Sequence, residues 1–310
     1  EEEGGDAHPA GRVEAAALNF KDVLNTLGMY PGDPGQPGSE CAGTVIAVGE
    51  DVTGFNVGDK VVALAPGCMR THLTVAASLA ALRPESMPAA GLITLPIAYI
   101  TAAFALDHVG RMRAGESVLI HAAAGGVGQA AVQLALQAGL VVYATAGSEA
   151  KRDFVRALGV THVYSSRTLD FADAIMQATN GRGVDLVLNS LAGDFSARSL
   201  DVLAQDGRFL ELGKRDLLTS AEVQAYASSH GRRLDYQIID WGETAITEPE
   251  RIHQMLVDVM TSAAEGRIAP LPMQLFPLEA AADAFRTMAQ ARHIGKIVLA
   301  PPAPAATAAT

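Results

Sequence analysis

The chain has 310 residues, of which 49% are hydrophobic, and its net charge of −11 gives a pI near 5.1. This length suits one large α/β unit or two domains, and so acidic a chain is a poor candidate for non-specific nucleic-acid binding, which needs clustered Lys and Arg. Two cysteines cannot build a disulfide framework, and neither a signal peptide nor an apolar run of about 18 residues is recognisable, so we expect a cytoplasmic protein without a transmembrane helix.

The first hundred residues are rich in Gly, Pro and β-branched residues. The acidic start EEEGGDAHPA has the composition of a linker, and RVEAAAL after it predicts a strand that enters the fold at once, as in a domain excised from a longer polypeptide. Residues 41–49 predict a buried strand, 51–64 a turn and a second strand, and 72–84 further β structure. This region is therefore expected to be antiparallel or barrel-like.

From about residue 97 the hydrophobic period changes to that of helices and alternating strands. YITAAFALDHVGRM has helical spacing, and the strands SVLIHA, LVVYATA, THVYSS, VDLVLNS and GRFLELG follow, with predicted helices after the first three. Ser148 is the expected N-cap of the helix 148–159. Such alternation predicts a doubly wound parallel sheet.

The last part of the chain returns to strand, helix and strand. These elements run from PLPMQLF to HIGKIVL, and we expect them to pack back on the N-terminal part. The tail APPAPAATAAT is Ala/Pro-rich, as in a semi-rigid linker.

A glycine-rich turn stands between the strand 117–122 and the helix 127–139. Ala123, Gly125 and Gly128 match G-x-G-x-x-G with Ala in first place. Gly125 allows close approach to a pyrophosphate, Gly128 allows close helix–strand packing, and the helix N-terminus offers N–H groups to phosphate. We therefore expect a dinucleotide site; the alternative is a tight turn without a ligand.

The residues after the second strand of this sheet favour NADPH over NADH. NAD enzymes usually place Asp or Glu there, whereas here Thr145-Ala146-Gly147-Ser148 follows, with Lys151 and Arg167 nearby. Cations beside a hydroxyl suit a 2′-phosphate. Ordinary charged residues on a helix face are the alternative.

Metal and nucleophile chemistry have little support in the sequence. Cys41 and Cys68 lack partners at zinc-ligand spacing, Cys41 fits a small core residue, and His121 fits a strand end better than a metal ligand. No G-x-S-x-G motif is present.

Three residues are candidates for acid–base chemistry. Lys214 follows ELG at a strand end, Asp240 closes the apolar run YQIID and could partner a lysine, and Tyr30 precedes a Pro/Gly-rich loop. Solvated charges, and an aromatic that closes a helix end, remain the alternatives.

Several longer stretches resemble the medium-chain dehydrogenase/reductase superfamily, and more narrowly the enoyl reductase domains of modular polyketide synthases and of animal fatty acid synthase. They include ALNFKDVLNTLGMYPG, GSECAGTVIAVG, SSRTLDF, GRGVDLVLNSLAG, GRFLELGKRD and QARHIGKIVL, and they span nearly the whole chain.

This resemblance implies an α/β fold with a Rossmann sheet and a GroES-like β-barrel. The expected domains are a substrate-binding part over 1–97, an NADPH-binding domain over 98–238, a C-terminal completion of the substrate domain over 239–300, and a linker over 301–310. The family's zinc-dependent branch has Cys at the position of Asn19 and Gly-His-Glu at the positions of Gly38-Ser39-Glu40, so the resemblance implies a zinc-free reductase. The family also has further strand structure before RVEAAALNF, so we expect either that the domain start is trimmed or that part of it is not included in this sequence.

The implied reaction is NADPH-dependent reduction of a trans-2-enoyl thioester on an acyl carrier protein, beside neighbouring domains such as a ketoreductase. The family's proposed proton donors correspond to Tyr30, Lys214 and Asp240, and a tyrosine at position 30 is associated with 2S α-methyl products. The expected cofactor-binding residues are Asn19, Ala123, Gly125, Gly126, Val127, Gly128, Ser148, Lys151, Ser166, Arg167, Asn189, Ser190, Leu191, Gly213 and Lys296. A soluble quinone or enone reductase and a non-catalytic NADPH-binding scaffold are the competing functions.

Overall fold

A computed structural model of the chain describes residues 9–31, 33 and 35–301. The acidic start and the Ala/Pro tail, for which linkers are predicted, lie almost wholly outside this range. The chain divides into two compact units, one made of the residues up to Ile97 and from Thr244 onward, the other of Ala98–Glu243. Each unit is described by itself.

The first unit is built on a seven-stranded sheet in the order β12-β13-β1-β2-β3-β5, with β4 also pairing with β1. Every pairing is antiparallel except that of β12 with β13. Gly43 allows β2 to approach β1, because a Cβ there would collide with the Arg12 carbonyl oxygen. The strands are β1 (Ala10–Leu18), β2 (Glu40–Ala47), β3 (Lys60–Leu64), β4 (His72–Thr74), β5 (Ala80–Leu82), β12 (Met273–Pro277) and β13 (Lys296–Ala300).

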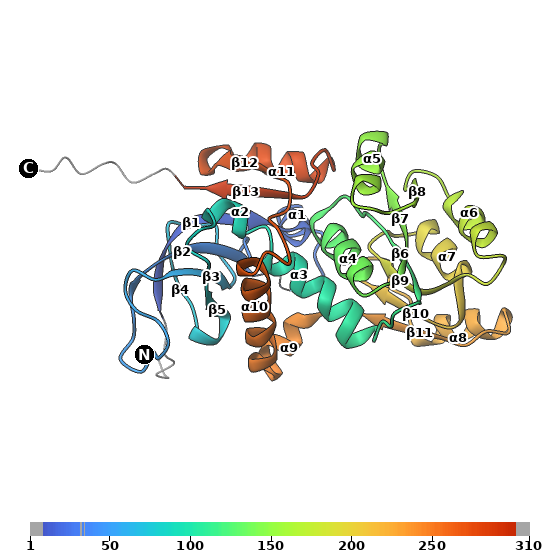
Figure 1. Ribbon diagram of the computed structural model, residues 1–310, viewed down its shortest axis with the longest axis horizontal. Helices are drawn as coiled ribbons and strands as arrows, with labels where there is room; N and C mark the ends of the chain where they lie inside the picture. The colour runs from blue at the N-terminus through green and yellow to red at the C-terminus, as the bar shows by residue number, and fades with distance from the viewer. Residues whose placement is uncertain (1–8, 32, 34, 302–310) are drawn as a thin grey trace, which may run out of the picture. The chain divides into compact units, whose positions relative to one another are not determined.

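Two apolar clusters fill this unit. Cys41 and Cys68 are both buried in the cluster inside the strands, so the prediction that Cys41 is a core residue is confirmed. The second cluster joins Leu18 and Val23 to Ile297 and Met288, and so packs the C-terminal segment against the first strand and helix, as predicted. Figure 1 shows the resulting proximity of α11 to β12 and β13. The helices are α1 (Phe20–Thr26), α2 (Ala89–Leu92), α10 (Pro249–Ala264) and α11 (Ala281–Ala289), with short turns η1 (Ala77–Leu79) and η3 (Leu278–Ala280).

The second unit is a parallel sheet of six strands in the order β11-β10-β9-β6-β7-β8. The chain runs outward from β6 to β8, then returns to β9 on the other side of β6. The strand order therefore reverses between β6 and β9, and ligands of such sheets bind outside the carboxyl ends of the strands at this switch point. The strands are β6 (Ser117–Ile120), β7 (Val141–Ala146), β8 (His162–Ser165), β9 (Val184–Asn189), β10 (Leu203–Glu211) and β11 (Leu234–Ile238).

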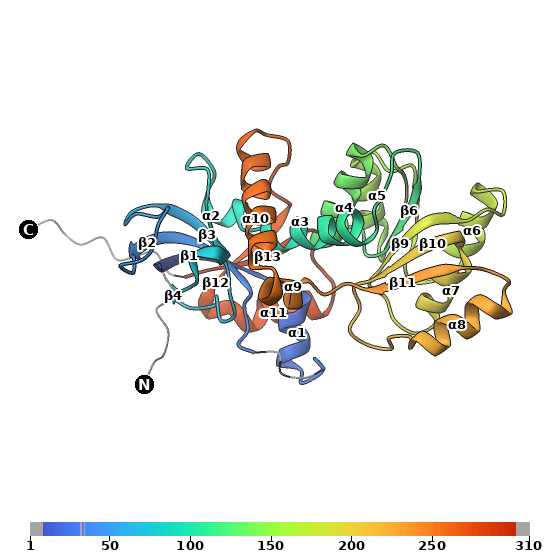
Figure 2. The same cartoon turned by 90° about the horizontal axis from the view of Figure 1, so that it is seen from below.

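Helices cover both faces of this sheet, with α4 above the strands and α8 below them in the view of Figure 2. Ser148 accepts a hydrogen bond from the Lys151 amide at 3.3 Å, so its predicted role as the N-cap of α5 is confirmed. The helices are α3 (Pro96–Ala103), its π-helical continuation η2 (Phe104–Val109), α4 (Gly126–Gln137), α5 (Glu149–Ala157), α6 (Phe171–Ala178), α7 (Asp194–Asp201), α8 (Ser220–Ser229) and α9 (Trp241–Thr247); α3 and α9 cross the unit boundaries.

The sequence leads us to expect no apolar run of about 18 residues, but the helical stretch Ala89–Val109 contains such a run. By length and composition it could cross a membrane, but 72% of its most apolar window is buried inside the protein. Burial of this kind is what a core helix shows, and one such helix is weak evidence for a membrane span.

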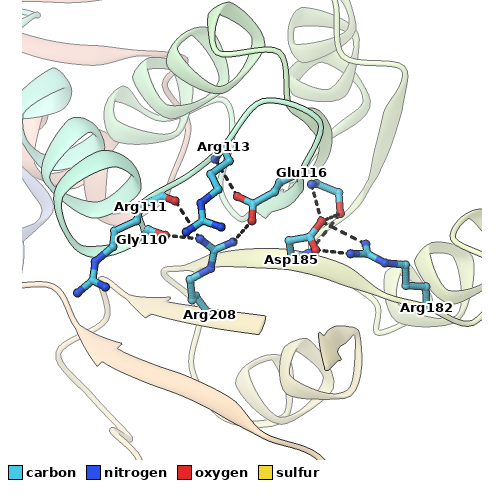
Figure 3. A network of polar contacts seen from close by, with 8 residues as sticks. Gly110, Arg111, Arg113, Glu116, Arg182, Asp185 and Arg208 are labelled. Carbon is cyan, nitrogen blue, oxygen red and sulfur yellow. Dashed lines mark hydrogen bonds and ion pairs between the residues drawn. The ribbon is translucent and has the colours of Figure 1, made fainter. Parts of the chain in front are cut away.

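Arg208 fastens the end of this stretch to the amino-terminal side of the sheet. Its guanidinium donates to the carbonyl oxygens of Gly110 and Arg111, at 2.6 and 3.0 Å, and pairs with Glu116 at 2.5 Å. Figure 3 shows Arg208 between these groups, with the Asp185–Arg182 pair beside them. Carbonyl groups that the helix end leaves without intrahelical donors are thereby satisfied.

Candidate functional site

The glycine turn lies where the sequence predicts it, between β6 and α4. A Cβ on Gly128 would lie 2.5 Å from the Ala122 carbonyl oxygen and 2.6 Å from the Ala123 Cα, so only glycine fits without backbone movement. The Ala123 amide donates to the Thr145 carbonyl at 3.0 Å, which ties the turn to β7. Gly125 is the N-cap of α4 and has no side chain to cap it, so the positive end of the helix dipole suits a phosphate.

A group of cations and hydroxyls lies just beyond the end of β7. The Ser166 amide donates to the Ala146 carbonyl at 3.1 Å and brings the segment after β8 alongside. The Arg167 guanidinium packs against Gly147, where a Cβ would lie 2.8 Å from Nη2. Burial lowers the pKa of the Lys151 amine, and the nearby charge of Arg167 lowers it further. The structure thus brings the predicted Lys151, Ser166 and Arg167 together.

Arg152, the other cation in this part of α5, is neutralised locally. Its guanidinium makes an ion pair with the Glu149 carboxylate, which also accepts from Arg156 at 2.8 Å. Arg152 is therefore a weaker candidate for binding an anionic ligand.

Asn189 and Glu211 end the neighbouring strands β9 and β10 and are both buried. The Asn189 Nδ2 donates to Glu211 Oε2 at 2.7 Å and to the Leu191 carbonyl at 2.8 Å. The Asn189 side chain is thus bonded within the protein. Its predicted contact with a cofactor stays a prediction. Ser190 beside it is exposed, and Leu191 is half-buried.

Lys214 and Asp240 form an ion pair at the same edge of the sheet. Lys214 Nζ lies 2.8 Å from Asp240 Oδ2, so the expected lysine partner of Asp240 is present. The Gly242 amide donates to Asp240 Oδ1 at 3.0 Å, and Trp241 Nε1 donates to Thr101 Oγ1 at 3.0 Å. These bonds anchor the segment that carries the carboxylate.

The first unit holds a buried polar cluster at the start of α1, β2 and β13. Lys296 Nζ donates to Asn19 Oδ1 and to Glu40 Oε1, both at 2.7 Å, and Asn19 Nδ2 donates to Glu40 Oε1 at 3.0 Å. Asp22 accepts from the amides of Asn19 and Gly38, both at 2.8 Å. The structure therefore brings the predicted Asn19 and Lys296 together around a carboxylate, Glu40, for which sequence reasoning had no role.

Tyr30 belongs to the first unit as well, on the loop after α1. It is half-buried, and Lys21 Nζ lies 5.1 Å from the centroid of its ring. That distance allows a cation–π interaction.

Comparisons with known proteins agree with both units. Residues 11–91 match the family described as alcohol dehydrogenase GroES-like domain, and residues 158–299 match the family described as zinc-binding dehydrogenase. The predicted fold class, a Rossmann sheet with a GroES-like substrate domain, is thereby confirmed.

Two solved structures and one curated relative are particularly similar. The CurK enoyl reductase is 38% identical with a TM-score of 0.88, covering 95% of this chain and 91% of that one. The CurF ER cyclopropanase from the curacin A biosynthetic pathway is 31% identical with a TM-score of 0.88, covering 97% and 93%. A phenolphthiocerol/phthiocerol polyketide synthase protein of Mycobacterium tuberculosis is 45% identical over 294 residues, which are 94% of this chain and 13% of that protein.

Proposed function

Because the chain belongs to the enoyl reductase domains of polyketide synthases, within the medium-chain dehydrogenase/reductase superfamily, we propose that it reduces the 2,3 double bond of a trans-2-enoyl thioester with NADPH. An oxidoreductase role follows from the family. The cofactor, the substrate and the residues that act on it are the proposal.

The observation that carries the proposal is the arrangement at the carboxyl edge of the second unit's sheet. The Lys151–Arg167 cations lie beyond β7, where a dinucleotide places the 2′ position of its adenosine ribose, and no Asp or Glu ends β7. The Lys214–Asp240 pair lies beyond β10 and β11 at the same edge. Cations that suit a 2′-phosphate and a lysine–carboxylate pair that suits proton transfer, both at one sheet edge, support an NADPH-dependent reduction.

The chemistry divides between the cofactor and the chain's own residues. NADPH, when bound, supplies the hydride for the β-carbon of the enoyl group. The electron pair of the double bond moves onto the α-carbon and thioester oxygen, and the resulting enolate takes one proton at the α-carbon. The Lys214 ammonium can supply that proton, and the Asp240 carboxylate orients it. The Tyr30 phenol is the second donor in the proposal, and it would set the face on which the α-carbon is protonated.

The name of the second matching family raises the question of zinc. A catalytic zinc takes three ligands from Cys, His, Asp and Glu, and within the described ranges no group of three such residues is placed to hold a metal ion. At Asn19 and Glu40 the Lys296 ammonium already neutralises the carboxylate. The residues present do not fit a zinc ion, and we propose a reaction that needs none.

The setting of the reaction is also a proposal. The chain spans about 13% of the length of the polyketide synthase protein it matches. We propose that its substrate arrives on an acyl carrier protein, beside domains such as a ketoreductase, in the cytoplasm.

A spectrophotometric assay of NADPH oxidation tests this function. Crotonyl and 2-methyl-2-butenoyl thioesters, on pantetheine or on an acyl carrier protein, should be reduced, with little turnover of naphthoquinone. Turnover of naphthoquinone alone would establish a quinone reductase instead. Tight NADPH binding without oxidation by any enoyl thioester would establish a scaffold domain.

A further inference from the structure

Glu211 is a buried carboxylate at the end of β10, and it takes no part in the chemistry described above. Its two oxygens serve different elements of the second unit. Oε2 accepts from Asn189 Nδ2 at 2.7 Å, and Oε1 accepts from the Gly213 amide at 2.6 Å. The side chain is almost completely buried, so water does not replace these donors.

The Asn189 side of this contact lies at the switch point of the sheet. β9 pairs with β6 on one side and β10 on the other, and Asn189 is its last residue. The Asn189 amide also donates to the Leu191 carbonyl and to Ser196 Oγ, and its Oδ1 accepts from the Leu191 amide at 3.2 Å. One side chain thus sets the path of the loop after β9, and Glu211 holds that side chain.

The Gly213 side of the contact leads directly to the acid–base pair. A Cβ on Gly213 would lie 2.6 Å from Glu211 Oε1, so a side chain there would displace the carboxylate from its present position. Lys214 is the next residue. The Glu211 carbonyl in turn accepts from the Ile239 amide at 2.8 Å, directly before Asp240. Lys214 and Asp240 therefore each follow a residue whose backbone amide donates to Glu211, Gly213 to its carboxylate and Ile239 to its carbonyl.

We propose that Glu211 is a positioning residue for the reduction: its carboxylate fixes the loop after Asn189 and the turn that carries Lys214 in one geometry. The inference rests on the proposed function. A carboxylate suits this place because it offers acceptors and no donor, and the amides of Asn189 and Gly213, the Tyr236 hydroxyl and the Lys214 ammonium around it are all donors. Burial raises the pKa of the Glu211 carboxyl, while the hydrogen bonds from Asn189 and Gly213 oppose the rise. A buried charge is costly, which argues against a residue that only fills space.

The substitution Glu211→Gln tests this role with little change of shape. Its amide has one acceptor and one donor, so either Asn189 or Gly213 must face another donor. We expect kcat with an enoyl thioester to fall about tenfold or more, since a misplacement of about 1 Å can cost on the order of 10²-fold. The deuterium isotope effect with C4-deuterated NADPH should increase, because hydride transfer becomes slower relative to the other steps.

A matched control separates positioning from loss of folded enzyme. Glu116→Gln also turns a carboxylate into an amide, but it weakens the Arg208 contact at the amino ends of the same sheet. It should lower the melting temperature and leave the isotope effect unchanged, because a smaller folded fraction lowers rates without altering the chemistry. An isotope effect and a kcat in Glu211→Gln equal to those of the wild type overturn the inference.

A binding measurement makes the test independent of turnover. Fluorescence titration with NADPH should show a Kd about threefold or more higher in Glu211→Gln, and unchanged in Glu116→Gln. Failure of the wild type to reduce any thioester would refute the proposed function, and the Kd would still test Glu211. If the Glu211→Gln variant keeps the rate and the Kd of the wild type, the positioning role is refuted and the proposed function stands.

Discussion

The Nζ atom of Lys296 lies 2.7 Å from Oε1 of Glu40, and both side chains are buried within the first unit. The second oxygen of Glu40 accepts from the Ile97 amide at 2.8 Å, and Asn19 contacts both charged groups. An ion pair so far from water depends on each partner, because a lone buried charge has neither solvent nor a counter-ion.

Removal of one charge should destabilise the protein. In Lys296→Met the Glu40 carboxylate stays buried without its counter-ion, and we expect the free energy of unfolding to fall by about 3–5 kcal/mol. Urea denaturation measures this change. The double variant Lys296→Met/Glu40→Gln removes both charges and should recover part of the loss. A loss in the single variant below about 1 kcal/mol, as at an exposed pair, would contradict a dry environment.

The preference for NADPH should depend on Lys151. Lys151→Ala removes a cation from the group near Arg167, and we expect the KM for NADPH to rise about tenfold or more while the KM for NADH changes little. Steady-state kinetics with each cofactor measures both values. Arg152→Ala is the matched control, because that guanidinium is paired with Glu149, and it should have the smaller effect on NADPH. Equal increases for the two cofactors would remove Lys151 from the 2′-phosphate site.

Local sequence patterns predicted the parts of this protein that local geometry determines. The glycine turn and the Ser148 cap each depend on residues within one strand–turn–helix unit, and the structure places them as expected. The helices α7, α8 and α10 had no predicted counterpart. In α8 the apolar residues do not gather on one face, and it has no buried residue, so the usual helical pattern is absent.

Long-range contacts explain what sequence reasoning missed. Glu40 and Lys296 stand 256 positions apart, and Glu211 stands 22 positions from Asn189. Each carboxylate looks like an ordinary polar residue in or beside a strand, and only the sheet order shows that a donor faces it. One signal was available: a carboxylate inside the apolar stretch FLELG, three residues before Lys214, is unusual for a buried strand.

The two proton-donor candidates should have separable effects. Tyr30→Phe keeps the ring that lies near Lys21 and removes only the hydroxyl, so we expect hydride transfer to continue and the configuration at the α-carbon to change. Lys214→Ala removes an ammonium and leaves Asp240 without this partner, and should lower kcat about 10²-fold or more. Chiral chromatography of the product from a 2-methyl-2-enoyl thioester, together with rates, measures both. An unchanged product configuration in Tyr30→Phe would exclude Tyr30 as the donor.

His121 gives the second unit a dependence of stability on pH. The imidazole is buried at the end of β6, with Nδ1 2.8 Å from Thr145 Oγ1 and Nε2 2.7 Å from Ser199 Oγ. Burial lowers the pKa of His121 to about 3 from its usual 6.5. The folded protein therefore keeps this ring neutral at pH values where the unfolded chain protonates it.

The sign of the effect follows from the two pKa values. Above pH 6.5 the ring is neutral in both states, and as the pH falls from 6.5 towards 3 only the unfolded chain takes up the proton, so stability is lost. The slope for one group is about 1.4 kcal/mol per pH unit. Urea unfolding between about pH 6.5 and pH 5 should show this loss. His121→Gln should reduce the slope of unfolding free energy against pH by the amount that corresponds to about one proton. His72→Gln, at an exposed position on β4, is the control for the loss of an imidazole outside the core. An unchanged slope in His121→Gln would mean that the buried imidazole takes up its proton equally in both states.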